Sequence, residues 1–349
     1  MKQIFNLFSL SIILFLLIFY SCKSNENNNE IKKDPTVLPL VLTNKLLDVT
    51  KSSAICGGLI LDSIDYQVTA RGVCWSETSN PTIDNNKTID GSGSGNYISK
   101  ITGLTENREY YVRSYAVNKL GISYGEEIRF VTASIEDIDG NGYHTVKVGD
   151  QEWIIENLKT KKYNDGTFIT KFNNPSVWAN STNPGYGWFA NDSVKYGEAY
   201  GALYNWYAVN TGKLAPKGWH VATNNDWLKL IDYVNNNRGN SVTLSKALAS
   251  KNYWKISGNS GSIGCNLDIN NSSGFSALGG GYISVIYQSY EDLNIAGYWW
   301  TPTDFNGGAY AAHVQLVGAS TIVNTYFDSF DMFKPKMSGM SVRCIKDSL

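Results

Sequence analysis

The first residues that could do chemistry form an acidic stretch, Asp137-Ile-Asp-Gly-Asn141. Its carboxylate and amide side chains alternate as the oxygen ligands of calcium loops do, so Asp137, Asp139 and Asn141 are weak candidates for a Ca2+ site. A complete loop would continue with further ligands and a bidentate glutamate, whereas residues 143–148 read as a strand. The sequence therefore favours a simple turn, and we expect no metal or cofactor.

The other polar side chains do not form a recognisable catalytic set. The three histidines, His144, His220 and His313, lie far apart and lack a metal-ligand spacing such as His-x-x-x-His. There is no Gly-x-Ser-x-Gly motif, and no spacing among the many acidic residues singles out a pair for glycoside cleavage. We therefore expect a protein that is not an enzyme.

Cysteine is the remaining residue type with chemistry, and the chain has five. Cys22 follows a small residue and an apolar run over residues 4–20, so residues 1–21 resemble a bacterial lipoprotein signal peptide and Cys22 its lipidated residue. An uncleaved anchor helix is the alternative. Both interpretations predict export and a membrane partner. We expect an outer-membrane lipoprotein on the periplasmic or the surface-exposed side.

Disulfides are permitted in an exported protein. The other four cysteines divide two and two between the folded segments defined below, so Cys56–Cys74 and Cys265–Cys344 are candidate bridges. Buried free thiols are the alternative, because cysteine is among the residues most often buried.

Aromatic residues supply candidates for ligand binding. A loop rich in Asn, Ser, Gly and Pro carries Trp178, Tyr186 and Trp188. Aromatic side chains that are not needed for packing could stack on a sugar or anchor a protein partner. The alternative is that they close the edge of the core. Weaker candidates of the same kind are Tyr287, Tyr290 and Tyr310.

The elements that must position these residues belong to two folded segments. A length of 349 residues leaves room for two domains of ordinary size. A formal net charge of −1 argues against a nucleic-acid partner. Residues 22–35 are polar and have few apolar side chains to bury, which predicts a flexible tether.

Residues 36–133 show short alternating apolar runs that are separated by turn residues. The clearest strands cover residues 68–75 and 109–117. Leu104 stands six residues before Tyr110, which resembles the fibronectin type III pattern, where the tyrosine hydroxyl bonds back to the upstream turn. The resemblance implies an all-β sandwich that acts as a spacer.

In the second segment, residues 134–349, one stretch predicts a strand followed directly by a helix. Residues 219–221 alternate as a short strand, and Thr223 with Asp226 three positions later forms a variant capping box. The helix should end near residues 235–239, where Asn and Gly favour termination. The apolar positions of this helix recur at one face: Trp227, Leu230, Ile231 and Val234.

Further motifs follow in order along the second segment. They are Trp153-Ile-Ile-Glu-Asn-Leu158, Gly218-Trp-His-Val221, Gly274-Phe-Ser-Ala-Leu278, Tyr298-Trp-Trp-Thr301 and Ser341-Val-Arg-Cys-Ile-Lys-Asp347. In this order and spacing they resemble the Fibrobacter succinogenes major paralogous domain, a family of bacterial exported proteins. That family is similar in outline to C-type-lectin-like folds and to formylglycine-generating enzymes. The resemblance implies an α+β domain with a small twisted antiparallel sheet and two or more helices.

The same resemblance implies helices over residues 198–207 and 223–234. It also implies buried aromatic side chains at Trp153, Trp206, Trp219, Trp227 and Trp299. The resemblance to lectin-like folds suggests sugar binding, yet the sequence has neither the Glu-Pro-Asn nor the Trp-Asn-Asp motif of calcium-dependent lectins. Cys265 and Cys344 do not form the close pair that a formylglycine-generating oxidase uses.

The function that we expect is non-enzymatic adhesion, or capture of a polysaccharide or a surface protein, at the cell envelope. An envelope structural component without a small ligand is one alternative. The other is a hydrolase or an enzyme similar to the formylglycine-generating family.

Overall fold

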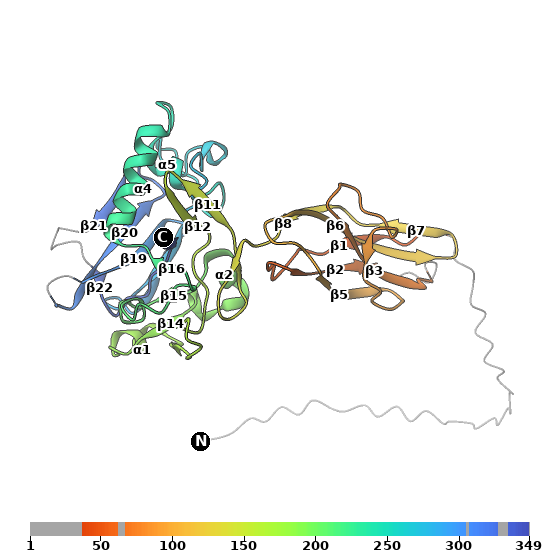
Figure 1. Cartoon of the computed structure of the whole chain (residues 1–349), viewed down its shortest axis with the longest axis horizontal. Helices are drawn as coiled ribbons and strands as arrows, with labels where there is room; N and C mark the ends of the chain where they lie inside the picture. The colour runs from red at the N-terminus through yellow and green to blue at the C-terminus, as the bar shows by residue number, and fades with distance from the viewer. Residues whose placement is uncertain (1–36, 62–66, 305–306, 327–333, 349) are drawn as a thin grey trace, which may run out of the picture. The chain divides into compact units, whose positions relative to one another are not determined.

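The computed structural model describes residues 37–61, 67–304, 307–326 and 334–348 (Figure 1). The predicted signal peptide, Cys22 and the tether over residues 22–35 lie outside this part of the chain. Among the residues that are described, no helix combines the length and the apolar character needed to cross a membrane.

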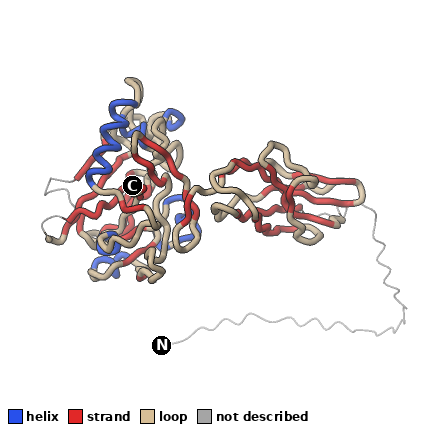
Figure 2. The backbone as a smooth tube through the Cα atoms, in the orientation of Figure 1, coloured by secondary structure: helices blue, strands red, loops and turns tan. Residues whose placement is uncertain are grey.

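Residues 37–133 form two antiparallel sheets (Figure 2). The first sheet has the order β1-β2-β5, and the second has the order β4-β3-β6-β7 with β8 also paired to β6. Side chains from both sheets share one core, which includes Ala54 and Ile101 from the first and Val73 and Val112 from the second. This is a fibronectin type III-like sandwich, as predicted. Its strands are β1 (Val41–Thr43), β2 (Ser53–Ile60), β3 (Ala70–Ser76), β4 (Asn86–Lys87), β5 (Gly95–Thr102), β6 (Glu109–Asn118), β7 (Gly121–Tyr124) and β8 (Ile128–Val131).

The predicted tyrosine contact is present at the start of β6. The hydroxyl oxygen of Tyr110 accepts a hydrogen bond from the backbone N–H of Thr105 at 3.2 Å, and Leu104 is buried beside it. The Tyr110 ring stacks on Phe130 with 5.9 Å between ring centroids. This bond ties the turn before β6 to the core of the sandwich.

The second segment, residues 134–348, contains several small sheets and short helices. One sheet has the order β11-β12-β23-β16, a second β13-β14-β15, and a larger one β18-β17-β19-β20-β21 with β22 paired to β20. The strands are β9 (Ile135–Glu136), β10 (Gly142–Tyr143), β11 (Thr145–Val148), β12 (Gln151–Ile154), β13 (Thr170–Lys171), β14 (Gly185–Gly187), β15 (Leu203–Tyr204), β16 (Trp219–Val221), β17 (Gly280–Ser284), β18 (Ser289–Leu293), β19 (Ala296–Asp304), β20 (Tyr310–Val317), β21 (Val323–Tyr326), β22 (Lys334–Pro335) and β23 (Cys344–Lys346). The helices are α1 (Pro175–Ala179), α2 (Ser193–Tyr200), α3 (Trp206–Val209), α4 (Asn224–Asn237) and α5 (Leu244–Leu248). The mixed α and β character agrees with the predicted class.

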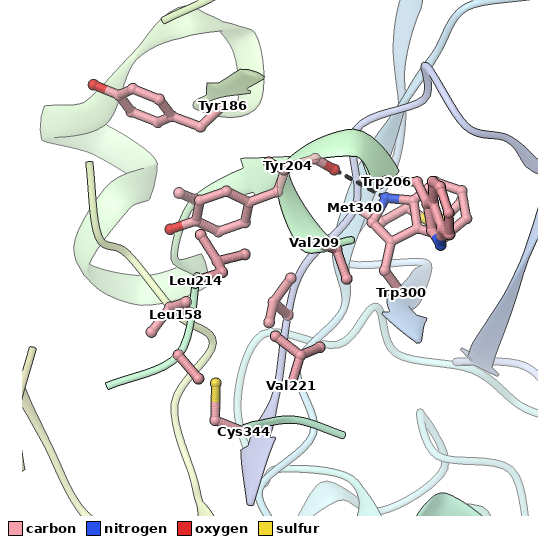
Figure 3. Packing of buried hydrophobic residues seen from close by; sticks show 14 of the residues in the cluster. Leu158, Tyr186, Tyr204, Trp206, Val209, Leu214, Val221, Trp300, Met340 and Cys344 are labelled. Atoms are coloured by element: carbon pink, nitrogen blue, oxygen red, sulfur yellow. Dashed lines mark hydrogen bonds between the residues drawn. The ribbon is translucent and has the colours of Figure 1, made fainter. Parts of the chain in front are cut away.

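Aromatic side chains fill the core of this segment. The ring centroids of Trp153 lie 5.3 Å from those of both Trp227 and Phe275, and Trp227 lies 5.8 Å from Trp299. A second cluster surrounds Trp206 and Trp300, where the Trp300 indole donates to the backbone carbonyl of Tyr204 at 2.9 Å (Figure 3). The five tryptophans that the sequence places in the core are all buried.

Arg343 lies at the centre of this core and is fully buried. Its guanidinium donates to the side-chain oxygen of Asn157 at 2.8 Å and to the backbone carbonyls of Ile154, Phe275 and Ser276 at 3.1, 3.0 and 2.8 Å. Burial lowers the pKa of Arg343 to about 9. Because carbonyl and amide oxygens satisfy its donors, this cation joins β12, β23 and the segment before β17 into one unit.

The strand and helix around Thr223 form as predicted. Thr223 Oγ1 accepts from the Asp226 N–H at 3.3 Å, and the Thr223 N–H donates to Asp226 Oδ2 at 2.9 Å, which completes the capping box. Helix α4 ends at Asn237, and Gly239 follows with a φ of 76°.

The predicted helix over residues 198–207 is wrong. Helix α2 ends at Tyr200 because Gly201 adopts a φ of 74°, and a Cβ there would lie 2.8 Å from the Asn157 carbonyl oxygen. The chain then pairs as β15, and Asn205 caps the separate helix α3 by accepting from the Ala208 N–H at 3.0 Å. The family resemblance implies one continuous helix here, and Gly201 interrupts it in this chain.

Candidate functional site

The three loop aromatics that were the main ligand-binding candidates are core residues, and that prediction is wrong. The exposed fractions of Trp178, Tyr186 and Trp188 are 0, 6 and 9%. The Trp178 ring meets Phe172 edge-on at 5.4 Å, and Tyr186 meets Trp188 in the same way at 6.0 Å. Helix α1, capped by Asn174, forms within the loop and places Trp178 in a small hydrophobic cluster. These side chains stabilise the fold and leave little ring surface for a ligand.

The weaker tyrosine candidates have separate environments. Tyr290 is half-buried and packs on Phe189 with 5.3 Å between ring centroids. Tyr287 is highly exposed at the turn between β17 and β18, and Tyr310 is exposed at the start of β20. Neither exposed ring borders the two cavities described below.

The acidic turn is held together by hydrogen bonds within the protein. The Asp137 carboxylate accepts from the N–H groups of Asp139 and Asn141 at 2.9 and 3.0 Å and from the Tyr143 hydroxyl at 2.6 Å. The Asp139 carboxylate accepts from the Lys161 N–H at 2.6 Å. Burial acts to raise the pKa of Asp139, but the hydrogen bonds that its carboxylate accepts outweigh burial and lower the pKa. In the described ranges, no group of three or more acidic, His or Cys side chains is arranged to hold a metal ion. The carboxylates serve as turn acceptors, which leaves the weak calcium candidates without support.

The four described cysteines are free thiols, so both predicted disulfides are wrong. Cys56 belongs to the core between the two sheets of the sandwich. Cys74 stands between the core residues Val73 and Trp75 on β3, and its thiol faces the Pro81 carbonyl. Cys344 is fully buried in β23, and Cys265 is half-buried in the loop before β17. Burial raises the pKa of Cys74 to about 11, which makes this thiol unreactive.

A cavity of about 280 Å3 lies between the end of α4 and the turn that joins β11 to β12. We call it the Tyr233 cavity. Its lining consists of Lys147, Val148, Tyr233, Val234, Asn237, Arg238, Ser272 and Ser273. It combines an aromatic ring with two cations and polar side chains, and its lining contains no carboxylate. Two of the polar groups already donate within the protein, Asn237 Nδ2 to the Tyr233 carbonyl at 2.8 Å and Ser273 Oγ to the Ala247 carbonyl at 2.7 Å.

Tyr233 is the half-exposed ring of this cavity, with an exposed fraction of 45%. The ring lies against Gly149, where a Cβ would come within 2.8 Å of the ring carbon Cδ2. Gly149 also has a φ of 61°, which favours glycine. A glycine at the hairpin turn thus makes room for the ring on one side, while part of the ring remains open to solvent.

A second cavity of about 500 Å3 adjoins the first, because Lys147 lines both. We call it the His220 cavity. Its other lining residues are Asp150, Gln151, Glu152, His220, Asp226, Lys229, Ile345, Lys346, Asp347 and Ser348. His220 bridges two carboxylates here, with Nδ1 at 2.7 Å from Asp347 and Nε2 at 3.1 Å from Asp226.

The charged groups of the His220 cavity largely pair with one another. Burial acts to raise the pKa of Asp226, but hydrogen bonds from Thr223 and His220 outweigh it and the pKa is lowered from 3.8. Lys346 Nζ lies 2.8 Å from Glu152. Asp226 is already occupied by the helix cap and the histidine, so this cavity offers few unused ligand groups.

The three histidines have different surroundings. His144 pairs with Glu156 at 2.6 Å, which raises the pKa of His144 above 6.5. His313 is buried between Tyr298 and Trp300, and burial lowers its pKa to about 3. Only His220 lies at one of the two cavities.

Sequence reasoning missed Tyr233, although a signal was present. The apolar face of α4 is formed by Trp227, Leu230 and Val234, and Tyr233 stands one position before the last of them. Because the apolar stripe of a helix faces the core, an aromatic residue that lies beside the stripe is more exposed to solvent than one within it. The spatial neighbours Lys147 and Ser272 could not be found in this way, because they come from distant parts of the chain.

The fold and the cavities define a two-part protein, in which a β-sandwich precedes an α+β domain with a ligand-sized surface site. Residues 146–346 match the Fibrobacter succinogenes major domain, so the chain belongs to this family, which is typical of bacterial surface and secreted proteins. No curated protein matches the chain.

Solved structures similar to this chain cover about the length of the sandwich. A fibronectin type III domain of the human KIAA0970 protein is 16% identical, with a TM-score of 0.23, over 33% of this chain and 89% of that one. The sensor domain of the anti-sigma factor RsgI4 of Pseudobacteroides cellulosolvens is 15% identical, with a TM-score of 0.22, over 29% of this chain and 99% of that one. Because these scores are low, the assignment of the sandwich rests on its strand order.

Proposed function

We propose that this chain is an exported envelope lipoprotein whose C-terminal domain captures polysaccharide, without cleaving it, in the Tyr233 cavity. The observation that carries this proposal is a half-exposed tyrosine ring set among amide, hydroxyl and cationic donors. Sugar rings present apolar C–H faces to aromatic side chains and hydroxyl groups to polar ones, so this combination suits a saccharide.

The composition of the cavity supports capture over cleavage. Glycoside hydrolysis requires two carboxyl groups at the scissile bond. The residues that line the Tyr233 cavity include no Asp or Glu. In the adjoining cavity Asp226 and Asp347 contact His220 and Glu152 pairs with Lys346, which leaves Asp150 as the remaining carboxylate of its lining. A ligand in the Tyr233 cavity would therefore meet donors and an aromatic ring, and the role is binding.

The rest of the chain fits the same role. In this proposal Cys22 carries the lipid anchor in the outer membrane, residues 22–35 form the tether, and the sandwich is a spacer. Fatty-acid labelling of cells that express the chain should mark the wild type and leave a Cys22→Ser variant unlabelled. Equal labelling of both would remove the anchor from the proposal.

The binding test uses the full chain, purified in detergent, against xylan, dextran, alginate and polygalacturonate. At least one polysaccharide should bind, and Tyr233→Ala should lower its affinity about fivefold or more through lost ring contact. Tyr287→Ala is the matched control, because Tyr287 is more exposed than Tyr233 and lies outside both cavities. Binding of no polysaccharide, or equal binding by wild type and Tyr233→Ala, would refute the proposal.

A further inference from the structure

We propose that the captured polysaccharide is anionic, with carboxylate groups that contact Lys147 and Arg238, the two cations that line the cavity together with Tyr233. This inference rests on the proposed function and adds the class of ligand. Its basis is the charge of the Tyr233 cavity, since two cations and no carboxylate line it. Surface sites with mixed charges are the ordinary case, so a one-signed lining points to a ligand of the opposite sign.

Lys147 offers a charge that the described residues leave unused. It is exposed on β11 opposite Glu152 of β12, and among the described residues no hydrogen bond or ion pair engages its ammonium group. The Glu152 carboxylate pairs instead with Lys346 on β23 at 2.8 Å. Lys147 is thus available to a carboxylate at the boundary of the two cavities.

Arg238 is anchored at one edge of its guanidinium. Nε donates to Asn235 at 3.2 Å, and Nη1 donates to the backbone carbonyls of Gly239 and Val242. Within the described part of the chain, no hydrogen bond occupies Nη2. A guanidinium held in place in this way presents its remaining donors in a fixed direction, which suits a planar carboxylate.

The end of helix α4 opposes this charge only in part. The last turn of a helix carries about half a negative charge, which would repel an anion. Lys147 and Arg238 together bring two full positive charges to the same cavity. Asp232 also lies on α4, but its carboxylate accepts a hydrogen bond from Asn236 at 3.2 Å, and it does not line the cavity. The balance at the cavity remains positive.

The shared position of Lys147 also favours a polymer over a single sugar. A chain that extends from the Tyr233 ring past Lys147 reaches the His220 cavity, where Glu152 pairs with Lys346, Asp226 and Asp347 pair with His220, and Asp150 and Lys229 complete the charged lining. The excess of positive charge that selects an anion is therefore confined to the first cavity, and the second adds length.

The test compares one polymer in two forms, polygalacturonate and the same polymer after its carboxylates have been reduced to alcohols. The full chain should bind the carboxylated form more tightly, and Lys147→Ala should reduce that affinity about fivefold while leaving the reduced form unaffected. Arg238→Ala should act in the same direction. Lys171→Ala is the control, because Lys171 is an exposed lysine on β13 that lines neither cavity. Dextran sulfate serves as a second anion, and tighter binding of it than of polygalacturonate would overturn the assignment of carboxylate as the group that is recognised.

The outcomes separate this inference from the proposed function. Equal binding of both forms, lost in Tyr233→Ala and unaffected by Lys147→Ala, would overturn the anionic ligand and keep polysaccharide capture. Binding that double-stranded DNA displaces as readily as polygalacturonate would also overturn it, because simple charge attraction would then explain the data. Arg238 holds the loop after α4, so its replacement could unfold the domain. A melting curve of each variant shows whether it is folded. If Arg238→Ala is unfolded, the Lys147→Ala variant alone decides the test.

Discussion

Two arginines of the α+β domain have opposite surroundings. The Arg343 guanidinium lies 4.7 Å from the Phe275 ring centroid, is fully buried and donates to four oxygen acceptors. Arg238 lines the Tyr233 cavity and is held only along one edge of its guanidinium. The difference teaches that an arginine is structural when its donors are saturated, and is available to a ligand when they are not.

The largest expected effect is the loss of the buried cation. Arg343→Met should lower the free energy of unfolding by at least about 3 kcal/mol, because the acceptors of Asn157, Ile154, Phe275 and Ser276 lose their donor inside the core. Thermal or urea unfolding of the full chain measures it.

Lys346→Met is the matched control, because Lys346 lies on β23, just after Arg343 in the chain, but is exposed in its ion pair with Glu152. This variant should change the free energy of unfolding by less than about 1 kcal/mol. Similar losses of unfolding free energy in the two variants would show that burial does not determine how much each cation stabilises the fold.

The second effect concerns the aromatic residues. Trp178→Ala should cost about 3 to 5 kcal/mol of stability, because it empties the contact with Phe172 and Ile283. Trp178→Phe should cost much less, since the indole Nε1 is buried without a hydrogen-bond partner in the described part and nothing polar is lost. Both variants, where folded, should bind polysaccharide as the wild type does. Weaker binding by folded Trp178→Phe would restore this loop as a ligand site.

The smallest effect is a dependence on pH through His144. The hydrogen bond to Glu156 raises the pKa of His144 above 6.5, so its stabilisation is complete below that value and is lost as pH rises through the raised pKa. The melting temperature should therefore fall as pH rises from about 6.5 to about 8, and His144→Gln should reduce that fall. An identical pH profile for the two proteins would mean that this pair does not stabilise the native state.

Local signals predicted much of the fold. The capping residues Thr223 and Asp226 and the tyrosine of the sandwich each depend on neighbours within a few positions, and each is confirmed. The break at Gly201 differs from what the family resemblance implies, because the close approach of its backbone to Asn157 exists only in the folded chain.

The site was harder to predict, because its parts come together only in the folded chain. Trp178 stands in a polar loop, and its burial depends on helix α1 and on Phe172. Lys147, Tyr233 and Ser272 lie on a hairpin, a helix and a loop, and no spacing in the sequence connects them. Composition shows which aromatic residues a loop contains, whereas packing decides which of them a ligand can reach.

The central claim is that the ligand binds at the exposed Tyr233 ring and not at the buried loop aromatics. The most direct measurement is the affinity of the full chain for polygalacturonate, compared between Tyr233→Ala and Trp178→Phe after both are shown to be folded. The account predicts weaker binding for Tyr233→Ala and wild-type binding for Trp178→Phe. Wild-type binding by Tyr233→Ala together with a loss in Trp178→Phe would contradict it.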